Sequence, residues 1–310
     1  MSSPTLDTEI SVLLPVYNGG EYLKQSVSSV LKQRHTKFEL LIVDDCSTDG
    51  SREWLQSLND PRVRLFLNPA NKGLFPNLNF LCDQASSPLL KLWAQDDVMY
   101  DDCLRHFVDF HLKHPECGYT YCMRDMINAK GEMKPVSVID NTPELIDFST
   151  HSRITYRVGS LPGNIANVCI SKNALTAVGE FDTSMKISAD LDMWVRLSEH
   201  FTTGFIRKSL MQIRDHDKQL SRNEGSYVLH VEEDLRIYSH LDSVVAPDLR
   251  KSGRRALRRN KLMFYYSLFL KAFVSGRWKH AIRYRRAISA YDNFLLLTVR
   301  YPLQFLNKKK

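Results

Sequence analysis

Apolar and polar positions alternate in a regular way over residues 10–93. Short runs of large aliphatic and aromatic residues predict four strands: Ile10–Pro15, Phe38–Val43, Val63–Leu67 and Leu89–Trp93. Between them, apolar residues at helical spacing predict three helices: Glu21–Lys32, Ser51–Leu58 and Asn77–Ala85. Because strands and helices alternate and the strands are apolar throughout, we predict an α/β fold whose mostly parallel sheet is covered by helices on both faces.

Polar clusters follow each predicted strand. They are Tyr17-Asn18, Asp44-Asp45, Asn71-Lys72-Gly73 and Asp96-Asp97. In parallel sheets ligands bind beyond the carboxyl ends of the strands, so we expect these clusters to converge on one edge. No GxGxxG motif follows the first strand and no GxxxxGK[ST] motif occurs in the sequence. A bound phosphate would therefore need a metal ion.

The stretch WAQDDVMYDD, residues 93–102, places four acids directly after a buried strand. Acids at such a place are costly unless a positive group compensates them. Asp96 and Asp97 offer the hard oxygen ligands that suit Mg²⁺ or Mn²⁺. Alternatively, the pair caps the following helix, since acids favour helix N-termini. Asp101 and Asp102 are interpreted as solvated acids that open a helix over Cys103–Leu112.

The second half continues the α/β pattern less regularly. We expect strands over Tyr119–Met123, Val168–Ile170 and Thr203–Ile206, and helices over Lys172–Val178 and Asp190–Glu199. Residues 213–221 are predicted to form a polar loop.

Composition supports a globular chain. Its 310 residues are 43% hydrophobic and 25% charged, which leaves room for one large α/β domain and an appendage. The six cysteines include no CxxC pair and are expected to be reduced packing residues. The first ten residues lack the features of a secretory signal, so a cytoplasmic location is expected.

Charge is concentrated at the C-terminal end. Residues 251–310 contain sixteen Lys and Arg and one acid, a net charge of +15, whereas residues 1–250 carry −8. Helix-like stretches at 257–274 and 278–291 interleave apolar and basic positions. Three interpretations remain open: binding to an anionic lipid surface, binding to nucleic acid, and a helical appendage packed on the main domain. No nucleic-acid module is visible, so we expect no nucleic-acid partner.

Four segments together indicate a family. ISVLLPVYNGGEYLKQSVSSVLKQ, FELLIVDDCSTDGS, NKGLFPNLN and AQDDVM resemble, in order and spacing, the inverting family 2 glycosyltransferases of bacterial polysaccharide type, which have the Rossmann-like GT-A fold. The resemblance covers about residues 9–222. It implies a GT-A domain over residues 1–225 and a basic amphipathic helical extension over 226–310. The chain departs from the family at Leu78, Ala94 and Ala189, where relatives often carry arginine, an acid and glutamate.

The resemblance also implies where the nucleotide would bind. Asp44 would hold the base, usually uracil, and Asp45 would support the same loop. Asp96 would be the direct metal ligand, with Asp97 beside it in the DxD-type motif. The remaining residues of the nucleotide pocket would be Pro15, Tyr17, Asn18, Glu21, Lys72 and Gly73.

Two further segments resemble the chemical half of such a site. Ser188–Trp194 is similar to an EDxDxW segment and makes Asp190 the catalytic base, although this residue can also N-cap its helix and have its pKa lowered there. His216 resembles a histidine that reaches the metal or the diphosphate; alternatively it is an ordinary polar residue. Arg214 and Lys218 are candidates to offset diphosphate charge.

The implied activity is metal-dependent transfer of a sugar, with inversion, from a nucleotide sugar to a glycan or lipid-linked acceptor. The donor would be a UDP-sugar, or else a dTDP-sugar, and the protein would lie on the cytoplasmic face of an anionic membrane. Two alternatives stay open: a non-catalytic module that binds nucleotide sugars or glycans, and a scaffold that acts through its basic tail.

Overall fold

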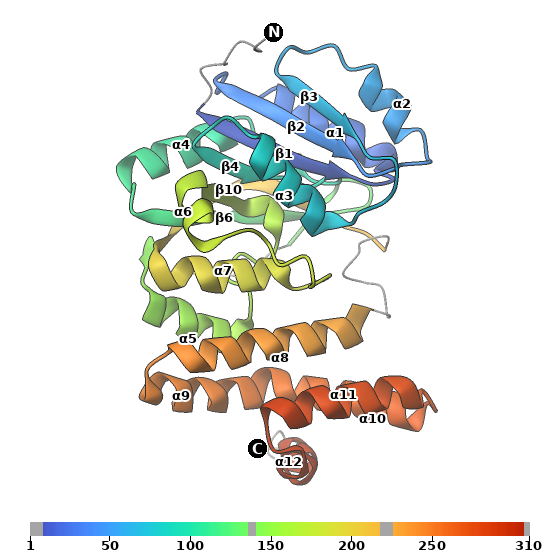
Figure 1. Cartoon of the computed structure of the whole chain (residues 1–310), viewed down its shortest axis with the longest axis vertical. Helices are drawn as coiled ribbons and strands as arrows, with labels where there is room; N and C mark the ends of the chain where they lie inside the picture. The colour runs from blue at the N-terminus through green and yellow to red at the C-terminus, as the bar shows by residue number, and fades with distance from the viewer. Residues whose placement is uncertain (1–8, 136–140, 218–225, 307–310) are drawn as a thin grey trace. The chain divides into compact units, whose positions relative to one another are not determined.

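The chain divides into two compact units. The computed structural model describes residues 9–135, 141–217 and 226–306 (Figure 1). The first unit comprises residues 1–148, 162–186 and 196–217, and the second comprises residues 149–161, 187–195 and 218–310. Each unit is therefore built from segments that are far apart in the sequence.

The first unit contains a mixed ten-stranded sheet, counted over its described residues. The strands are β1 (Ile10–Val16), β2 (Phe38–Asp44), β3 (Val63–Leu67), β4 (Leu89–Leu92), β5 (Val98–Met99), β6 (Cys117–Asn128), β7 (Met133–Lys134), β8 (Leu145–Ile146), β9 (Val168–Ser171) and β10 (Thr202–Asp215). Its helices are α1 (Gly20–Leu31), α2 (Ser51–Gln56), α3 (Leu74–Gln84), α4 (Cys103–Lys113), the 3₁₀ turn η1 (Ile165–Asn167) and α6 (Lys172–Val178).

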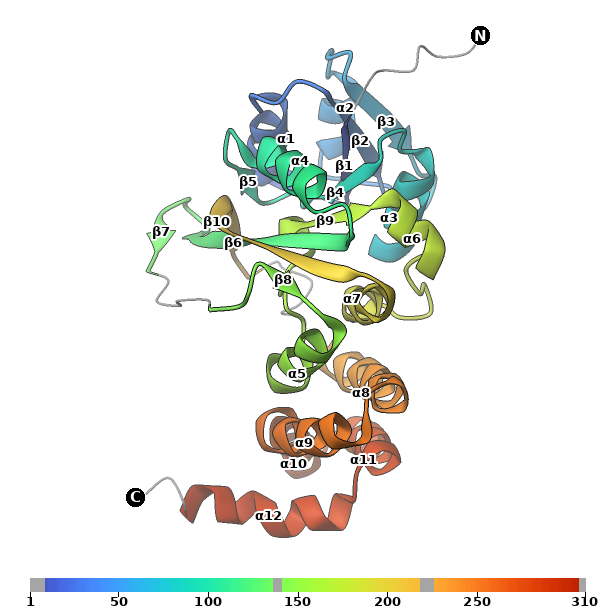
Figure 2. The same cartoon turned by 90° about the vertical axis from the view of Figure 1, so that its left-hand side faces the viewer.

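The main path of the sheet runs β3-β2-β1-β4-β9-β6-β10-β5. Strands β3, β2, β1 and β4 are parallel to one another, as predicted, whereas β9 is antiparallel to both of its neighbours. Helices α1 and α4 lie on one face of the sheet and α3 and α6 on the other (Figure 2). On the α1 and α4 face, alternate strand residues and helix residues form one core cluster: Val12, Leu14, Leu40, Ile42, Leu23, Val27 and Phe107.

The first four strands and three helices lie where the pattern predicted them, to within about three residues. The expectation for residues 213–215 was wrong. They belong to β10, which continues through Asp215 alongside β6. Register shifts between Ile206 and Ser209, and again before Gln212, interrupt the alternation of β10 and conceal its length in the sequence.

Two smaller expectations about side chains are confirmed. All six cysteines are free, and five of them are buried. Trp93 is fully buried at the end of β4, and its indole Nε1 donates a hydrogen bond to Ser26 Oγ at 2.8 Å. The apolar end of the fourth strand is therefore core, and the polar residues begin directly after it.

The second unit is helical in its described residues. Its elements are α5 (Phe148–Val158), the first part of α7 (Ala189–His200), α8 (Ser226–Val244), α9 (Pro247–Leu257), the π-helical turn η3 (Arg258–Leu262), α10 (Met263–Val274), α11 (Trp278–Tyr291) and α12 (Phe294–Leu306). Gly253 of α9 lies against the ring of Tyr156, where an added Cβ would come within 2.3 Å of the ring, so only glycine fits there.

Polar contacts also hold the second unit together. Tyr156 and Arg254 both donate hydrogen bonds to the carboxylate of Asp242, at 2.6 Å and 2.7 Å. In residues 251–310, the basic stretch, the side chains of Tyr265, Tyr284 and Ile288 are buried. The basic stretch is therefore partly core. Within the part of the chain that the structure describes, no helix is both long enough and apolar enough to cross a membrane.

Candidate active site

The loops after β1 and β2 are joined by side-chain hydrogen bonds. Asn18, in a left-handed conformation with φ of 49°, accepts a hydrogen bond from the Thr48 amide at 2.8 Å. The backbone amide of Asn18 donates a hydrogen bond to Ser47 Oγ at 3.0 Å. The polar clusters after β1 and β2 therefore lie together, as predicted. Tyr17, in the first of these loops, is half exposed.

Asp45 ties the loop after β2 to the loop after β3. Its carboxylate accepts hydrogen bonds from the amides of Lys72 and Gly73, both at 2.9 Å, and from Asn68 Nδ2 at 2.8 Å. Burial alone would raise the pKa of Asp45, but these hydrogen bonds and Asn77 outweigh it and lower the pKa. Asp45 is thus a fixed anion that shapes the loop.

Asp44 is completely buried at the end of β2. Its Oδ2 accepts from Arg52 Nε at 2.6 Å and from the Ser47 amide at 3.3 Å. Its Oδ1 is buried and has no hydrogen-bond partner among the described residues. Sequence reasoning missed Arg52, although an arginine on the next helix, eight residues on, is a recognisable partner for a buried acid.

The loop after β4 is fastened to the loop after β1. Gln95 accepts a hydrogen bond from the Tyr17 amide at 2.9 Å and donates one to the Tyr17 carbonyl at 3.1 Å. Gln95 is a connecting residue that was not predicted from the sequence. With this contact, loops from all four parallel strands are connected at one edge of the sheet.

The acid pair and His216 come together at this edge. His216 Nε2 lies 2.8 Å from Asp96 Oδ2. Asp97 is 1% exposed, and its Oδ1 accepts from the Arg214 amide at 2.9 Å. Burial, and then the charge of Asp96, raise the pKa of Asp97 to about 8.

Two buried polar atoms in this cluster lack partners within the described ranges: Asp97 Oδ2 and His216 Nδ1. Unpaired buried polar atoms are costly, so a site with two of them suits a further ligand such as a cation. Across residues 9–135, 141–217 and 226–306, however, no group of three or more His, Cys, Asp or Glu side chains is arranged so that it could hold a metal ion. A metal here would need additional oxygen ligands from a substrate or water.

Arg214, a candidate to offset diphosphate charge, has a buried side chain. Arg214 lies in β10 with 2% of its surface exposed, and its guanidinium stacks on the Tyr22 ring at 4.5 Å. It donates to the Asp96 carbonyl at 3.0 Å and to Gln25 Oε1 at 2.6 Å. Arg214 therefore fixes the acid loop instead of facing solvent, while Lys218 lies outside the described residues.

The other residues predicted to line the nucleotide pocket differ in how far they are buried. Pro15 lies in β1 and is partly buried, and Glu21 is exposed in the first turn of α1. Lys72 is exposed, and Gly73 adopts φ of 90°, a conformation that favours glycine. The side chain of Asn79, the last residue of the NKGLFPNLN segment, forms hydrogen bonds of 2.9 Å and 3.0 Å with the Phe181 backbone, so it supports packing.

Asp190 lies in the first turn of α7, in the second unit. Its Oδ1 accepts a hydrogen bond from the Leu191 amide at 2.8 Å. The expected lowering of its pKa does not occur. Burial outweighs that hydrogen bond, and the charge of Asp234 adds to it, so the pKa of Asp190 rises to about 6.

A network of side chains holds the segment before Asp190. Glu233 accepts hydrogen bonds from the amides of Ile187 at 3.0 Å and Ser188 at 2.8 Å. Ser188 Oγ donates to Asp234 at 2.8 Å. Glu233 and Asp234 went unnoticed in the sequence because α8 shows no signal that distinguishes buried acids from surface acids.

Comparison with known proteins identifies the family of the chain. The sequence model of glycosyl transferase family 2 matches residues 11–169, just over half of the chain. The teichuronic acid biosynthesis glycosyltransferase TuaG of Bacillus subtilis, itself described as putative, is 26% identical over 69% of this chain and 82% of its own length. The Escherichia coli UDP-Glc:alpha-D-GlcNAc-diphosphoundecaprenol beta-1,3-glucosyltransferase WfgD is 30% identical over 39% of this chain and 48% of its own.

Solved structures match over more of the chain. Residues 1–349 of S. aureus TarS superimpose with a TM-score of 0.63 and 19% identity, covering 91% of this chain and 81% of that one. The same TarS fragment in complex with UDP-GlcNAc gives a TM-score of 0.61 and 18% identity, covering 92% and 91%. The fold is thus that of the GT-A glycosyltransferases. With the family match over β1 to β9, the chain belongs to glycosyl transferase family 2 and is a glycosyltransferase.

Proposed function

We propose that this glycosyltransferase moves a sugar from a UDP-sugar, or alternatively a dTDP-sugar, to a glycan or lipid-linked acceptor, with metal dependence and with inversion at the anomeric carbon. One observation carries the proposal: Asp96, Asp97 and His216 meet beyond the parallel strands and leave Asp97 Oδ2 and His216 Nδ1 buried without partners. A diphosphate with its metal ion would satisfy such a site.

The donor side supplies groups suited to a nucleoside. Asp44 Oδ1 is a buried acceptor without a partner among the described residues, which suits the imide N–H of uracil or thymine. Arg52 keeps the other oxygen of Asp44 occupied and so fixes the carboxylate plane. Lys72, whose loop is fixed by Asp45, supplies positive charge beside the nucleotide.

Asp96, Asp97 and His216 are the residues that would hold Mg²⁺ or Mn²⁺. Such an ion, when bound, supplies Lewis-acid stabilisation of the departing diphosphate. The protein's own contribution is to fix these ligands. Arg214 holds Asp97 through its amide and the Asp96 backbone through its guanidinium, so both acids keep their places before a donor arrives.

Asp190 is proposed as the base. A group with a pKa of about 6 is ionised at neutral pH and still basic enough to take the proton of an acceptor hydroxyl as that oxygen attacks the anomeric carbon. A single attack of this kind inverts the configuration. The hydrogen bonds from Ile187 and Ser188 to Glu233 hold the start of α7, which orients Asp190.

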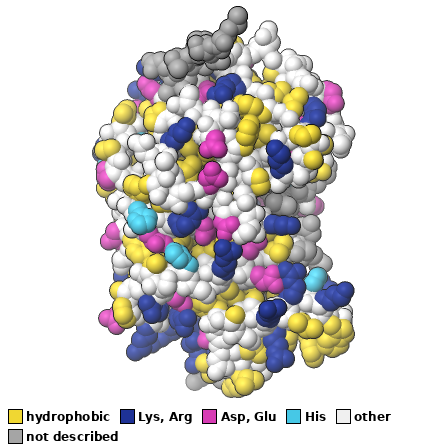
Figure 3. Space-filling view, viewed as in Figure 1, with side chains coloured by type: hydrophobic (Ala, Val, Ile, Leu, Met, Phe, Trp, Pro, Cys, Tyr) yellow, Lys and Arg dark blue, Asp and Glu magenta, His cyan; other side chains and the backbone are white. Residues whose placement is uncertain are grey.

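The relatives suggest the acceptor class. The name of WfgD specifies a GlcNAc-diphosphoundecaprenol acceptor, and the name of TuaG specifies teichuronic acid biosynthesis. We therefore propose polysaccharide synthesis at a cytoplasmic membrane surface. The basic stretch supports this location: Phe273, Trp278 and Ile282 are about half exposed or more among its charges. Figure 3 shows hydrophobic and basic side chains gathered over the helices of the second unit.

A transfer assay tests the proposal. UDP-glucose, UDP-N-acetylglucosamine and their dTDP counterparts are offered with a sugar-diphosphopolyprenol acceptor, with Mn²⁺ or with EDTA, and the new linkage is read by NMR. We expect turnover with Mn²⁺ and an anomer opposite to that of the donor. Retention of configuration, or full activity in EDTA, would contradict the proposal. Donor binding without transfer or hydrolysis would favour the non-catalytic module.

A further inference from the structure

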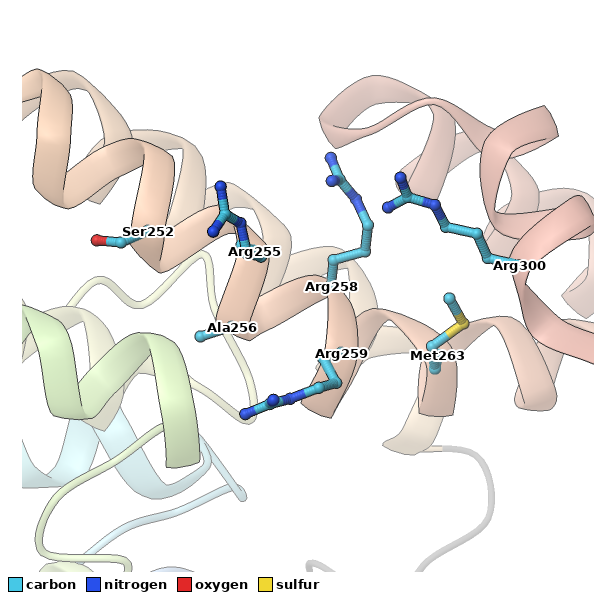
Figure 4. A pocket seen from close by; sticks show the side chains of 7 residues that line it. All are labelled: Ser252, Arg255, Ala256, Arg258, Arg259, Met263 and Arg300. Carbon is cyan, nitrogen blue, oxygen red and sulfur yellow. The ribbon is translucent and has the colours of Figure 1, made fainter. Parts of the chain in front are cut away.

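The second unit contains a cavity of about 480 Å³ whose wall is unusually rich in arginine. Arg255 comes from α9, Arg258 and Arg259 from the π-helical turn η3, and Arg300 from α12. Arg258 and Arg300 point toward one another across it, and the thioether of Met263 lies below them (Figure 4).

The arginines of this pocket are short of counter-charge. Asp292 is the only acid in residues 251–310, and it already binds Arg258 through two hydrogen bonds, at 2.7 Å and 2.9 Å. Arg255, Arg259 and Arg300 are exposed, and none of them forms an ion pair within the described ranges. After Asp292 is counted, three positive charges in the pocket wall remain unbalanced.

The backbone brings these like charges together. Arg255, Arg258 and Arg259 stand at positions i, i+3 and i+4 of one continuous helical stretch and so share a face. Like charges at this spacing repel, and the turn that carries two of them is π-helical, a rare conformation that occurs often at functional sites. Arg300 adds a further guanidinium from a separate helix.

We propose that Arg255, Arg259 and Arg300, with Arg258 fixed by Asp292, form a binding site for a phosphate group, separate from the donor site. Guanidinium groups present paired N–H donors that match phosphate oxygens, and several of them can share one phosphate or diphosphate. The phosphate can be that of a free anion or that of a lipid headgroup. Both sources present the same oxygens to the pocket.

The test compares two triple variants with equal loss of charge. The pocket variant carries Arg255→Gln, Arg259→Gln and Arg300→Gln. The control carries Lys271→Gln, Lys279→Gln and Arg286→Gln, three exposed cations of the same unit that do not line the cavity. Calorimetry of the full chain in low salt with EDTA measures binding of inorganic pyrophosphate and, separately, of monomeric dihexanoyl phosphatidic acid.

We expect the pocket variant to lose at least tenfold in affinity for at least one probe, and the control to stay within twofold of the wild type. Stronger binding of pyrophosphate identifies a free anion as the source, and stronger binding of the phosphatidic acid identifies a headgroup. Equal losses in both variants would overturn the proposal, because charge alone would then explain binding. Absence of binding of both probes to the wild type would also overturn it. Unchanged melting temperatures establish that both variants are folded.

Discussion

His216 and Asp96 are 120 residues apart in the sequence, yet the imidazole Nε2 lies 2.8 Å from the carboxylate Oδ2. The contact joins the end of β10 to the loop after β4. It also leaves the second imidazole nitrogen buried and without a partner in the described part of the chain. The proposed metal site would use this histidine together with the acid pair.

The first prediction concerns metal dependence. Asp96→Asn should lower kcat/KM by about 10²-fold or more and remove the gain in UDP affinity that Mn²⁺ provides, because the amide is a poor ligand for a hard cation. Calorimetry of UDP with and without Mn²⁺ measures the gain. Asp101→Asn is the matched control, since Asp101 is an exposed acid of the same segment that pairs with Arg34. If Mn²⁺ still tightens UDP binding to Asp96→Asn, Asp96 is not a ligand.

The second prediction concerns the base. Asp190→Asn should reduce kcat by roughly 10²- to 10⁴-fold, because an amide cannot accept the proton, while UDP affinity changes less than twofold. Asp192→Asn, two residues further along the same helix, should retain turnover within a few-fold. Single-turnover assays and UDP calorimetry separate the two effects. Near-normal turnover in Asp190→Asn would remove Asp190 from the mechanism.

The third prediction concerns pH. Because the pKa of Asp190 is raised to about 6, kcat/KM should fall as the pH drops below about 6, where the base becomes protonated. Asp234 and His230 face this group, and the negative charge of Asp234 contributes to the rise. A profile of kcat/KM from pH 4.5 to 8 checks this. A profile that stays flat down to pH 4.5 would show an unshifted carboxyl.

The same raised pKa has a consequence for stability. The fold disfavours the ionised form of Asp190, so the cost grows as the pH rises from the ordinary pKa of 3.8 to about 6 and is fully present above that pH. Asp190→Asn should therefore be more stable than the wild type above that pH, by on the order of 1 kcal/mol because the residue is partly exposed. Denaturant unfolding at pH 5 and pH 8 compares the two, and the difference should shrink at pH 5.

The fourth prediction concerns the support of α7. Glu233→Ala removes the acceptor of two backbone amides and should destabilise the protein by roughly 1–3 kcal/mol. Glu233→Ala should also lower kcat by a larger factor than it raises the KM for the donor. Glu233→Gln keeps one acceptor oxygen and should recover much of both losses. Equal melting temperatures for Glu233→Ala and the wild type would show that these hydrogen bonds contribute little.

The fifth prediction concerns truncation. A chain that ends after Leu249 would lack Lys261 and Tyr265, which both bind Asp234, and Tyr284 and Ile288, which are buried. Buried apolar surface and a buried acid would be exposed, so we expect aggregation and a lower melting temperature. Light scattering of the purified fragment measures this. A monodisperse fragment with the wild-type melting temperature would show that the stretch is a separable appendage.

Much of the fold follows from local patterns. The strands from Ile10 to Leu92 are mostly apolar runs bounded by polar turns, and parallel packing places their polar ends together. The positions of Asn18, Asp45 and Lys72 at one edge were therefore predictable from the sequence. At that edge the amides of Lys72 and Gly73 donate hydrogen bonds to the carboxylate of Asp45.

The features that the sequence did not predict depend on contacts between residues far apart in the chain. The sequence places Arg214 in a loop because arginine is rarely buried. Its position inside the protein depends on the pairing of β10 with β6. The pKa of Asp190 likewise depends on burial and on Asp234, which lies in another helix. No local sequence pattern indicates the burial of Arg214 or the raised pKa of Asp190.

The pairing of β10 with β5 and β6 also bears on the order of folding. During synthesis, β1 to β4 emerge first and can pair with near neighbours in the sequence. The amide that binds Asp97 belongs to a residue 117 positions later, in a strand that leaves the ribosome only after most of the first unit is complete. The acid loop would therefore be the last part of this sheet to take its final form, and a nascent chain that stops before Thr202 would carry the two acids without the strand that fixes them.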